Sequence, residues 1–373
     1  MRLAVLKETR EGETRVAATP ESVKKFKALG LDLVVQAGAG AHAKIADADY
    51  SAAGAEIAPD AASALKDADI VLKVRGPSAP EISQFKNGAV LAALLAPHAE
   101  GEAIQSLAAQ GVTAFAMELL PRISRAQSMD VLSSQANLAG YKAVIDAAAQ
   151  FGRAMPMMMT AAGTIAPARV LVMGVGVAGL QAIATAKRLG AIVSATDVRP
   201  ATKEQVESLG GTFVAVMDEE FKNAQTAAGY AKPMSPEYQA KQAALTAETI
   251  KKQDIVITTA LIPGRKAPIL VTEEMIKTMK PGSVIMDLAA AAGGNTPLSK
   301  PDEVVEAHGV TILGPTNLPG ALAVDASSLY ARNLFNFLSL IVDKKTGALA
   351  LDWNDEIVKG SAVTKDGAPV ARS

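Results

Sequence analysis

The sequence predicts an α/β protein with two doubly wound parallel-sheet domains joined by long helices, the first domain being discontinuous. Three observations support this: short apolar runs alternate with helix-like segments, a glycine-rich turn joins one run to a helix, and an amphipathic helix occurs late in the chain. Strands that are apolar throughout are typical of parallel sheets covered by helices on both faces. We predict a first domain of residues 1–133 and 306–373, and a second of residues 134–305.

The first domain begins with alternating strands and helices. Apolar runs that predict its strands lie at residues 3–6, 33–36, 70–74, 89–92 and 113–115. The segments between them, at residues 20–30, 61–68 and 101–111, are long enough for crossover helices. A long helix is predicted from Asp130 into the second domain.

The late portion of the chain is expected to return to the first domain. Its amphipathic helix is marked by Leu334, Phe337, Leu338 and Ile341. The residues after Trp353 are predicted to form a polar hairpin.

A glycine-rich turn marks the start of the second sheet. The apolar run 168–173 ends in Gly174-x-Gly176-x-x-Gly179, and a helix-type sequence follows directly. In such a turn the first glycine makes the tight bend, the second lets the backbone approach a pyrophosphate, and the third lets the helix pack on the strand. The helix N-terminus then offers free N–H groups to phosphates. The pattern predicts a dinucleotide-binding, Rossmann-like domain.

An acidic residue follows at the position expected for ribose binding. Asp197 ends the next apolar run, 23 residues after Gly174, close to the ~20-residue offset at which an acid binds the ribose 2′-OH. A carboxylate there favours NAD(H), because it would repel the 2′-phosphate of NADP(H). Further apolar runs at residues 212–216, 254–259, 283–287 and 310–313 complete six strands.

Two other segments of the second domain are less regular. The polar stretch 219–253 interrupts the alternation of strands and helices, and both a functional insertion and a solvated surface excursion remain open. Met157, Met158 and Met159 are expected in the core or at an interface.

Composition excludes several classes of protein. With 37 basic and 38 acidic residues, charge gives no support to nucleic-acid or lipid-surface binding. The absence of cysteine excludes disulfides, thiolate catalysis and cysteine-ligated metals, and the three histidines share no metal-ligand spacing. The longest apolar windows are far shorter than the roughly 20 residues of a membrane span. We therefore expect a cytoplasmic protein without a bound metal or direct membrane insertion.

Three segments resemble a known family. They are residues 119–140, residues 169–191 around the glycine-rich turn, and residues 258–264, Thr-Thr-Ala-Leu-Ile-Pro-Gly. Together they resemble the NAD(H)-binding alpha component of proton-translocating nicotinamide nucleotide transhydrogenases, from residue 1 to about residue 370. The resemblance implies direct hydride transfer from NADH to NADP+ bound on a partner subunit, coupled to proton translocation. It also implies a homodimer, an NADP(H)-binding beta subunit, a membrane-spanning subunit, and peripheral association with the inner membrane through these partners.

The resemblance also assigns a polar loop beside the nicotinamide. Arg122 and Ser133 would orient the ring and its amide, Asp130 would hold that network, and Gln127 would reach toward the partner's nucleotide. The alternative from the residues alone is a capped helix start, with Ser128 or Asp130 as N-cap and Arg122 in a nearby salt bridge.

The same resemblance assigns the NAD(H)-binding residues, and NAD(H) is expected in the cleft between the domains. These residues are Gly174, Val175, Gly176, Val177, Ala178, Gly179, Asp197, Val198, Gly229, Tyr230, Ala260 and Leu261. Tyr230 matches the tyrosine of the family's mobile loop. Ala228 stands where the family usually has glycine, and Pro233 and Pro236 stiffen the chain after this tyrosine.

Two alternatives remain. Residues 7–17 and 71–77 also resemble alanine dehydrogenase, in which the residues matching Arg15 and Lys73 bind pyruvate. The histidine and carboxylate that this enzyme uses for acid–base chemistry fall at Leu95 and Ala291 here, so Arg15 and Lys73 are interpreted as structural ion-pair partners. A non-catalytic NAD(H)-sensing protein is the other alternative, and Ala291 favours it slightly because transhydrogenases commonly carry a carboxylate there.

Overall fold

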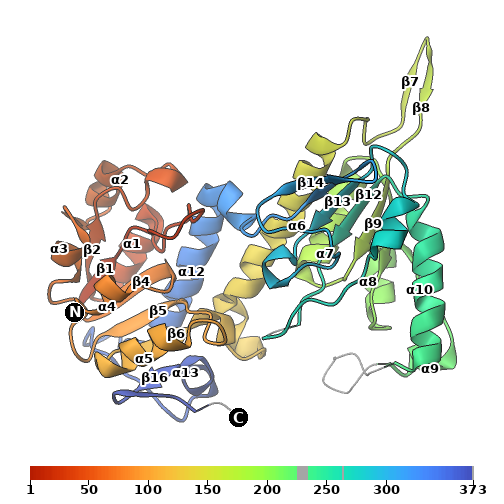
Figure 1. Ribbon diagram of the computed structural model, residues 1–373. Coiled ribbons are helices and arrows are strands. Elements are labelled where there is room, and N and C mark those ends of the chain that lie inside the picture. Colours follow the sequence, from red (N-terminus) through yellow and green to blue (C-terminus); the bar gives the residue numbers. More distant parts are fainter. Residues whose placement is uncertain (225–233, 263, 372–373) are drawn as a thin grey trace. The chain divides into compact units, whose positions relative to one another are not determined.

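Two parallel sheets, each flanked by helices, organise the computed structural model, which describes residues 1–224, 234–262 and 264–371 (Figure 1). The chain divides into unit 1, Met1–Gln135 with Pro319–Ser373, and unit 2, Ala136–Leu318. Both sheets start from a central strand and extend to either side of it. The predicted fold class, α/β with doubly wound parallel sheets, is confirmed.

Unit 1 contains a six-stranded parallel sheet in the order β3-β2-β1-β4-β5-β6. The strands are β1 (Arg2–Val5), β2 (Asp32–Gln36), β3 (Glu56–Ala58), β4 (Ile70–Arg75), β5 (Val90–Leu94) and β6 (Thr113–Ala116). Five of them were predicted to within two residues. The edge strand β3 was missed because its three residues include only one large apolar side chain.

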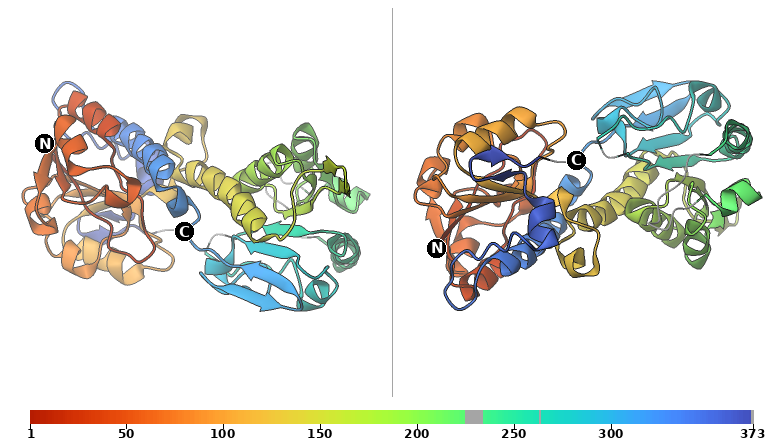
Figure 2. Two further views of the ribbon diagram at one scale, coloured as in Figure 1. Left: turned by 90° about the horizontal axis from the view of Figure 1, so that it is seen from above. Right: turned by 90° about the horizontal axis from the view of Figure 1, so that it is seen from below.

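Helices connect these strands and lie on both sides of the sheet, as two further views show (Figure 2). They are α1 (Pro20–Ala28), η1 (Ala41–Ala43), α2 (Asp47–Ala52), α3 (Ala61–Leu65), α4 (Ala79–Ile82), α5 (Gly101–Ala109), η2 (Met117–Leu119) and η3 (Ser124–Met129). Helix α1 starts with a capping box, in which the Thr19 hydroxyl accepts the Ser22 N–H and Ser22 reciprocates.

The late amphipathic helix α12 (Ala323–Ile341), preceded by η5 (Pro319–Leu322), packs into unit 1 as predicted. Its Leu334, Phe337, Leu338 and Ile341 are fully buried in the same core cluster as β1, β2 and α1. The ring of Phe337 meets that of Phe115 on β6 edge-on, with centroids 5.1 Å apart. Burying four large side chains makes α12 a major contributor to this core.

The C-terminal segment covers the outer edge of β6. It forms α13 (Glu356–Ser361) and the hairpin β16 (Thr364–Lys365)–β17 (Ala368–Pro369), so the predicted hairpin is present but follows an additional helix. The buried Thr364 hydroxyl accepts the Ala114 N–H at 2.8 Å and donates to the Val112 carbonyl at 2.6 Å. These bonds satisfy edge groups that would otherwise be free to pair with another chain.

Unit 2 contains a seven-stranded sheet in the order β11-β10-β9-β12-β13-β15-β14. The strands are β9 (Arg169–Met173), β10 (Ile192–Thr196), β11 (Thr212–Phe213), β12 (Ile255–Thr258), β13 (Val284–Asp287), β14 (Val304–Ala307) and β15 (Val310–Leu313). Six are parallel and were predicted. Strand β14 pairs antiparallel with β15 and was missed, because its short sequence lies among charged residues.

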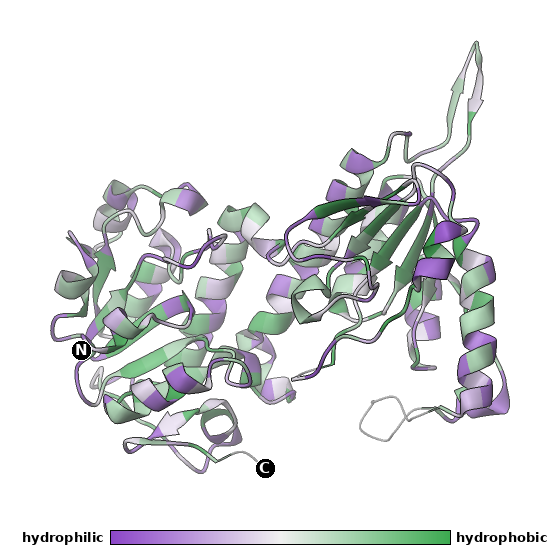
Figure 3. Ribbon diagram, in the orientation of Figure 1, coloured by the Kyte–Doolittle hydropathy of each residue, from purple (hydrophilic) through white to green (hydrophobic). Residues whose placement is uncertain are grey.

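The strands of this sheet are among the most hydrophobic segments of unit 2, whereas the outer helices carry the polar residues (Figure 3). The helices are α7 (Val177–Arg188), α8 (Thr202–Ser208), α9 (Glu219–Lys222), α10 (Pro236–Ile250), α11 (Glu273–Lys277) and η4 (Ala290–Ala292). Helices α9 and α10 lie in the polar stretch 219–253, of which residues 225–233 are outside the described residues.

Helix α6 (Val131–Gln150) carries the chain from unit 1 into unit 2. Within unit 2, a Cβ added to Gly140 would lie 2.1 Å from the Ala178 carbonyl oxygen. Only glycine therefore allows α6 to approach the start of α7 this closely.

The hairpin β7 (Met158–Thr160)–β8 (Gly163–Ile165) projects from the body of unit 2 (Figure 1). Met157, Met158 and Met159 are 58%, 40% and 78% exposed, so their prediction as core residues was wrong and an interface role remains a prediction. Among the helices of the described ranges, none has both the length and the apolar character required to span a membrane.

Candidate functional site

The glycine-rich turn connects β9 to α7 at the point where the strand order of the second sheet reverses, between β9 and β12. Ligands of open α/β sheets bind at such switch points, outside the carboxyl ends of the strands. Gly174 has φ +101°, and a Cβ there would lie 2.5 Å from the Thr259 hydroxyl. At Gly179 a Cβ would lie 1.9 Å from the Gly174 carbonyl oxygen. Both positions require glycine for the turn itself.

Gly176 differs from the other two glycines. A Cβ added there would meet nothing within 4 Å, and its backbone φ of −79° suits any residue. Gly176 and Val177 are exposed, and no side chain among the described residues caps the N-terminus of the 12-residue helix α7. Unpaired N–H groups at an open helix N-terminus fit a phosphate. The residues present therefore fit the pyrophosphate of a dinucleotide.

Asp197 lies directly after β10 and is bonded to the same turn. Its Oδ2 accepts the Val175 N–H at 2.7 Å. Its two oxygens also accept Nε and Nη2 of Arg199, each at 2.9 Å, and the Arg199 backbone N–H at 2.9 Å. This pairing raises the pKa of Arg199. Arg199 was not among the predicted site residues, although a cation two residues after the ribose-binding acid is visible in the sequence.

The loop after β12 is closed by a buried asparagine that the sequence did not reveal. Asn295 Nδ2 donates to the carbonyls of Ala260 at 2.9 Å and Pro268 at 2.8 Å, and its Oδ1 accepts the Ala260 N–H at 3.1 Å. Asp287 in turn accepts the Asn295 N–H at 2.8 Å. Asn295 therefore holds both ends of the loop that carries Ala260 and Leu261. No local sequence signal marks it, because the loop residues that its side chain bonds lie 35 and 27 positions away in the sequence.

The remaining predicted nucleotide contacts are less constrained. Val198 and Leu261 are 57% and 56% exposed, so both side chains are accessible. Gly229 and Tyr230, together with the departures noted at Ala228 and Pro233, lie outside the described residues.

The polar loop of unit 1 has a fixed backbone and free side chains. Asn333 and Asn336 of α12 both donate to the Ser128 carbonyl, at 2.9 and 2.8 Å. Arg125 pairs with Asp355 through two bonds of 2.5 and 3.0 Å. Ala126 and Met129 of this loop are buried in the core. The loop is therefore anchored on one side by its own fold.

Four predicted residues lie on or next to this loop. Asp130 accepts the Ser133 N–H at 2.9 Å and the Ser133 hydroxyl at 2.5 Å, which is the geometry of a helix cap at the start of α6. Arg122 and Gln127 are exposed, and Arg122 has no ion pair among the described residues. The capping alternative is thus correct for Asp130 but wrong for the salt bridge of Arg122.

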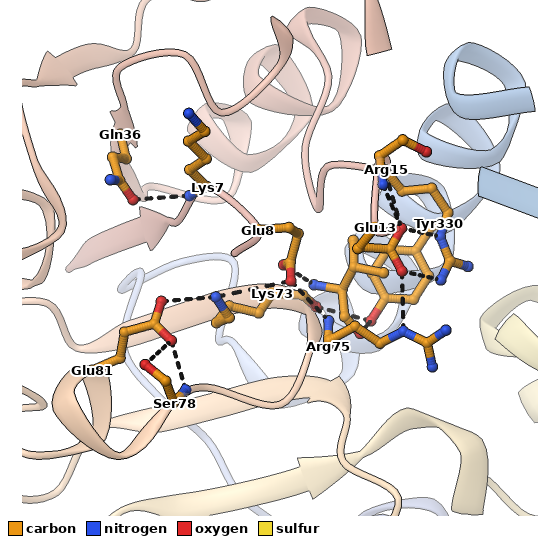
Figure 4. A network of polar contacts seen from close by, with 12 residues as sticks. Lys7, Glu8, Glu13, Arg15, Gln36, Lys73, Arg75, Ser78, Glu81 and Tyr330 are labelled. Carbon is orange, nitrogen blue, oxygen red and sulfur yellow. Dashed lines mark hydrogen bonds and ion pairs between the residues drawn. The ribbon is translucent and has the colours of Figure 1, made fainter. Parts of the chain in front are cut away.

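A second group of charged side chains is buried in unit 1 (Figure 4). Arg15 donates Nε and Nη2 to the two oxygens of Glu13, at 2.7 and 2.6 Å, and Nη1 to Gln135 at 2.9 Å. Lys73 Nζ donates to Glu81 at 2.9 Å. The side chains of Arg15 and Lys73 are only 3% and 1% exposed. The ion pairs predicted for these two cations are confirmed, and the protein's own carboxylates occupy them.

Two glutamates of this network titrate in opposite directions. Burial raises the pKa of Glu8 to about 7, although Lys73 and the N–H groups of Val74 and Arg75 act to lower it. Burial also acts to raise the pKa of Glu13, but the hydrogen bonds and charge of Arg15, together with Arg75, outweigh it and hold that pKa at about 2. Direct bidentate pairing therefore outweighs desolvation at Glu13 but not at Glu8.

The positions that alanine dehydrogenase uses for acid–base chemistry hold aliphatic residues. Leu95 is 3% exposed in the core of unit 1, and Ala291 lies in η4 of unit 2. His98 is exposed and follows Pro97 in a loop. None of these side chains except His98 can exchange a proton.

Known proteins resemble the whole chain. The alanine dehydrogenase/PNT N-terminal domain matches residues 4–139 and the C-terminal domain of that family matches residues 143–372. The first of the separate parts of NAD(P) transhydrogenase subunit alpha of Rhodospirillum rubrum is 58% identical over 375 residues, covering 99% of this chain and 98% of its own. Alanine dehydrogenase of Halomonas elongata is 31% identical over 351 residues, covering 92% and 88%.

A solved structure agrees with these sequences. The crystal structure of transhydrogenase from Sinorhizobium meliloti matches with a TM-score of 0.91 and 57% identity, covering 99% of this chain and 100% of its own. The chain therefore belongs to the alanine dehydrogenase/PNT family and, within it, is a transhydrogenase alpha subunit rather than an alanine dehydrogenase.

Proposed function

We propose that this protein is the NAD(H)-binding subunit of a proton-translocating NAD(P)+ transhydrogenase. It presents NADH for direct hydride transfer to NADP+ held on a partner subunit. The β9–α7 turn with its exposed Gly176, its uncapped helix N-terminus and Asp197 is the observation that supports this most directly. In the reaction, one hydride leaves C4 of NADH to give NAD+ and adds to C4 of NADP+ to give NADPH.

The chain's contribution to this reaction is binding and orientation. The turn and α7 hold the pyrophosphate, Asp197 holds the adenosine ribose, and the loop closed by Asn295 contributes Ala260 and Leu261. Val175, Val177, Ala178, Val198, Gly229 and Tyr230 complete the proposed NAD(H) site. Direct transfer between two nicotinamides requires alignment and exclusion of water more than acid–base groups. The aliphatic residues at Leu95 and Ala291 are compatible with that requirement.

The polar loop of unit 1 is proposed to act on the nicotinamide. Arg122 and Ser133 orient the ring and its amide, Asp130 holds Ser133, and Gln127 reaches toward the partner's nucleotide. The anchored backbone and the exposed side chains of Arg122 and Gln127 support this role, because fixed backbones place side chains accurately.

The assembly is proposed to be a homodimer with two kinds of partner. The exposed methionines of the β7–β8 hairpin support the dimer, since projecting apolar side chains are typical of protein interfaces. An NADP(H)-binding beta subunit supplies the hydride acceptor, and a membrane-spanning subunit couples transfer to proton movement. The protein is then cytoplasmic and associated with the inner membrane through these partners.

A reconstitution tests the function. The protein is mixed with the NADP(H)-binding component of a transhydrogenase, and hydride transfer from NADH to an NADP+ analogue with its own absorbance is followed. A parallel sample contains pyruvate and ammonium without the partner. Rapid transfer that requires the partner is the expected result.

Two other outcomes contradict the proposal. Consumption of NADH with pyruvate would identify an alanine dehydrogenase activity. Silence in both samples, with NADH still bound, would favour an NAD(H)-sensing protein.

A further inference from the structure

The carboxylate of Asp197 is saturated with hydrogen-bond donors. Oδ2 accepts Val175 N–H at 2.7 Å and Arg199 Nη2 at 2.9 Å, while Oδ1 accepts the Arg199 backbone N–H and Nε, both at 2.9 Å. A carboxylate has about four lone-pair positions, and four donors occupy them here. The Asp197 side chain is accordingly only 7% exposed.

A ribose hydroxyl can bond to Asp197 only if one of these donors withdraws. The Val175 N–H belongs to a buried residue of the glycine-rich turn, and the Arg199 N–H belongs to the backbone directly after β10. The Arg199 guanidinium, in contrast, is held by side-chain bonds and is 34% exposed. It is therefore the donor that can move with least disturbance of the backbone.

Arg199 also bears on the choice between nucleotides. Its Nη2 donates to the Val175 carbonyl at 3.2 Å, which keeps the guanidinium beside the turn. An arginine near this ribose is the group that accommodates a 2′-phosphate in NADP(H)-binding domains. Here its charge is paired with the two oxygens of Asp197 and is not available to a phosphate.

We infer that Arg199 is a second specificity-determining residue, which acts through its pairing with Asp197. With Asp197 charged, Arg199 is neutralised and the site accepts a free 2′-OH. Without that charge, Arg199 is released and receives a 2′-phosphate. The inference rests on the proposed NAD(H) site, but it concerns a residue that the proposal does not use.

The test uses two adenosine nucleotides that lack nicotinamide, 5′-AMP and 2′,5′-ADP. Their dissociation constants are measured by calorimetry for the wild type, Asp197→Asn, Arg199→Met and the double variant Asp197→Asn/Arg199→Met. The ratio of the two constants isolates the 2′-phosphate. The matched control is Asp197→Asn/Arg188→Met, which removes the same charge from the exposed C-terminal end of α7.

We expect Asp197→Asn to shift the ratio toward 2′,5′-ADP by about tenfold or more, the usual size of one charge-assisted contact. The shift should disappear in Asp197→Asn/Arg199→Met and persist in the Arg188 control. Arg199→Met alone should shift the ratio further toward 5′-AMP, because the Asp197 charge is then uncompensated.

Persistence of the full shift in Asp197→Asn/Arg199→Met would overturn the inference, since the phosphate would then be held by other groups. Absence of any shift in Asp197→Asn would also overturn it. Thermal unfolding of each variant identifies any that fail to fold, and Arg199→Met then serves as an independent test. If the folded wild type binds neither 5′-AMP nor NADH, the proposed function itself fails, which is a separate outcome.

Discussion

Gln127 and Glu8 are polar residues of unit 1 in opposite situations. Gln127 is exposed on a loop whose backbone is held by Asn333 and Asn336, so its side chain is free to meet another molecule. Glu8 is buried, and its oxygens accept the N–H groups of Val74 and Arg75 at 2.6 and 3.3 Å. The first is available for function and the second belongs to the fold, which gives different predictions for their substitution.

Shortening Gln127 to asparagine should slow hydride transfer roughly tenfold while leaving NADH affinity within about twofold, because the side chain is proposed to reach the partner's nucleotide rather than NADH. Transfer is measured in the reconstituted system and NADH binding by fluorescence titration of the isolated protein. Gln110→Asn, at the C-terminal end of α5, is the control. A large loss of NADH affinity would mean that Gln127 contacts the other nucleotide.

Replacing Glu8 by glutamine should change how stability depends on pH. The folded pKa of Glu8, about 7, exceeds its ordinary value of 4.5, so the folded state holds a proton that the unfolded state has released. Its stabilisation is present below pH 4.5 and is lost as the pH rises to about 7. The free energy of unfolding of the wild type should therefore fall relative to Glu8→Gln by at most about 3 kcal/mol between pH 5 and pH 8.

Urea unfolding at several pH values measures this difference. The exposed Glu102→Gln variant is the control and should follow the wild type at every pH. Parallel curves for wild type and Glu8→Gln would show that Glu8 stays charged in the folded protein.

Residue-level prediction from sequence succeeded where a motif was local. The three glycines and Asp197 lie within one strand-turn-helix-strand unit, and the structure places Asp197 against the turn as expected. Arg199 lies two residues farther on and was overlooked, although its spacing was visible. Asn295 could not be found, because its contacts with Ala260 and Pro268 exist only after β12 and β13 have paired.

The β9–α7 element shows how one residue type serves different purposes within six positions. Gly174 and Gly179 are required by the backbone, since added methyl groups would strike Thr259 and the Gly174 carbonyl. Gly176 has no such neighbour. Its side of the turn is open, so the reason for glycine there lies in what binds.

Alanine at Gly176 and at Gly179 should therefore have opposite effects. Gly179→Ala should destabilise unit 2 by about 2–3 kcal/mol, because α7 must move away from the turn. Gly176→Ala should leave stability within about 0.5 kcal/mol but reduce NADH affinity by about tenfold or more, because its methyl group occupies the approach of the pyrophosphate. Urea unfolding and NADH titration of both variants provide the comparison, each variant controlling for the other. Equal stability of the two, or unchanged NADH binding by Gly176→Ala, would contradict the assignment.

Elements were predictable where strands are long and apolar. The six parallel strands of unit 2 and five of the six in unit 1 carry continuous apolar runs. The three missed strand elements, β3, β14 and the β7–β8 hairpin, are at sheet edges or outside the sheets, where burial is small and the sequence is mixed. Their formation depends on backbone pairing with a neighbour rather than on a side-chain pattern.

At the scale of the whole molecule, the chain builds unit 1 from two separated segments and unit 2 from one. The stripe of apolar residues on α12 was sufficient to predict that this helix packs into a core. The β7–β8 hairpin extends from unit 2 and exposes Met157 and Met159, which no core of the described chain covers. A second copy of the protein is the partner proposed for this hairpin.

Changing Met157 and Met159 together to serine should weaken the proposed homodimer. Each buried methionine contributes about 1.5–3 kcal/mol, so the dimer dissociation constant should rise roughly 100-fold or more. Analytical ultracentrifugation over a range of concentrations measures it. The control replaces Val304 and Ile192, which are 57% and 42% exposed elsewhere on unit 2, by serine. A wild-type monomer, or a dimer unaffected by the methionine changes, would contradict the proposal.

The division of unit 1 into two segments has a consequence for synthesis on the ribosome. The core of unit 1 needs Tyr330, Leu334, Phe337, Leu338 and Ile341 of α12, whereas unit 2 is complete at Leu318. At about 5–20 residues per second, roughly 10–40 s separate the synthesis of Gln135 from that of Ile341. During that interval the apolar face that α12 covers is exposed to other nascent chains and to chaperones. The second unit along the chain is thus the first that can finish folding, and the N-terminal unit closes last.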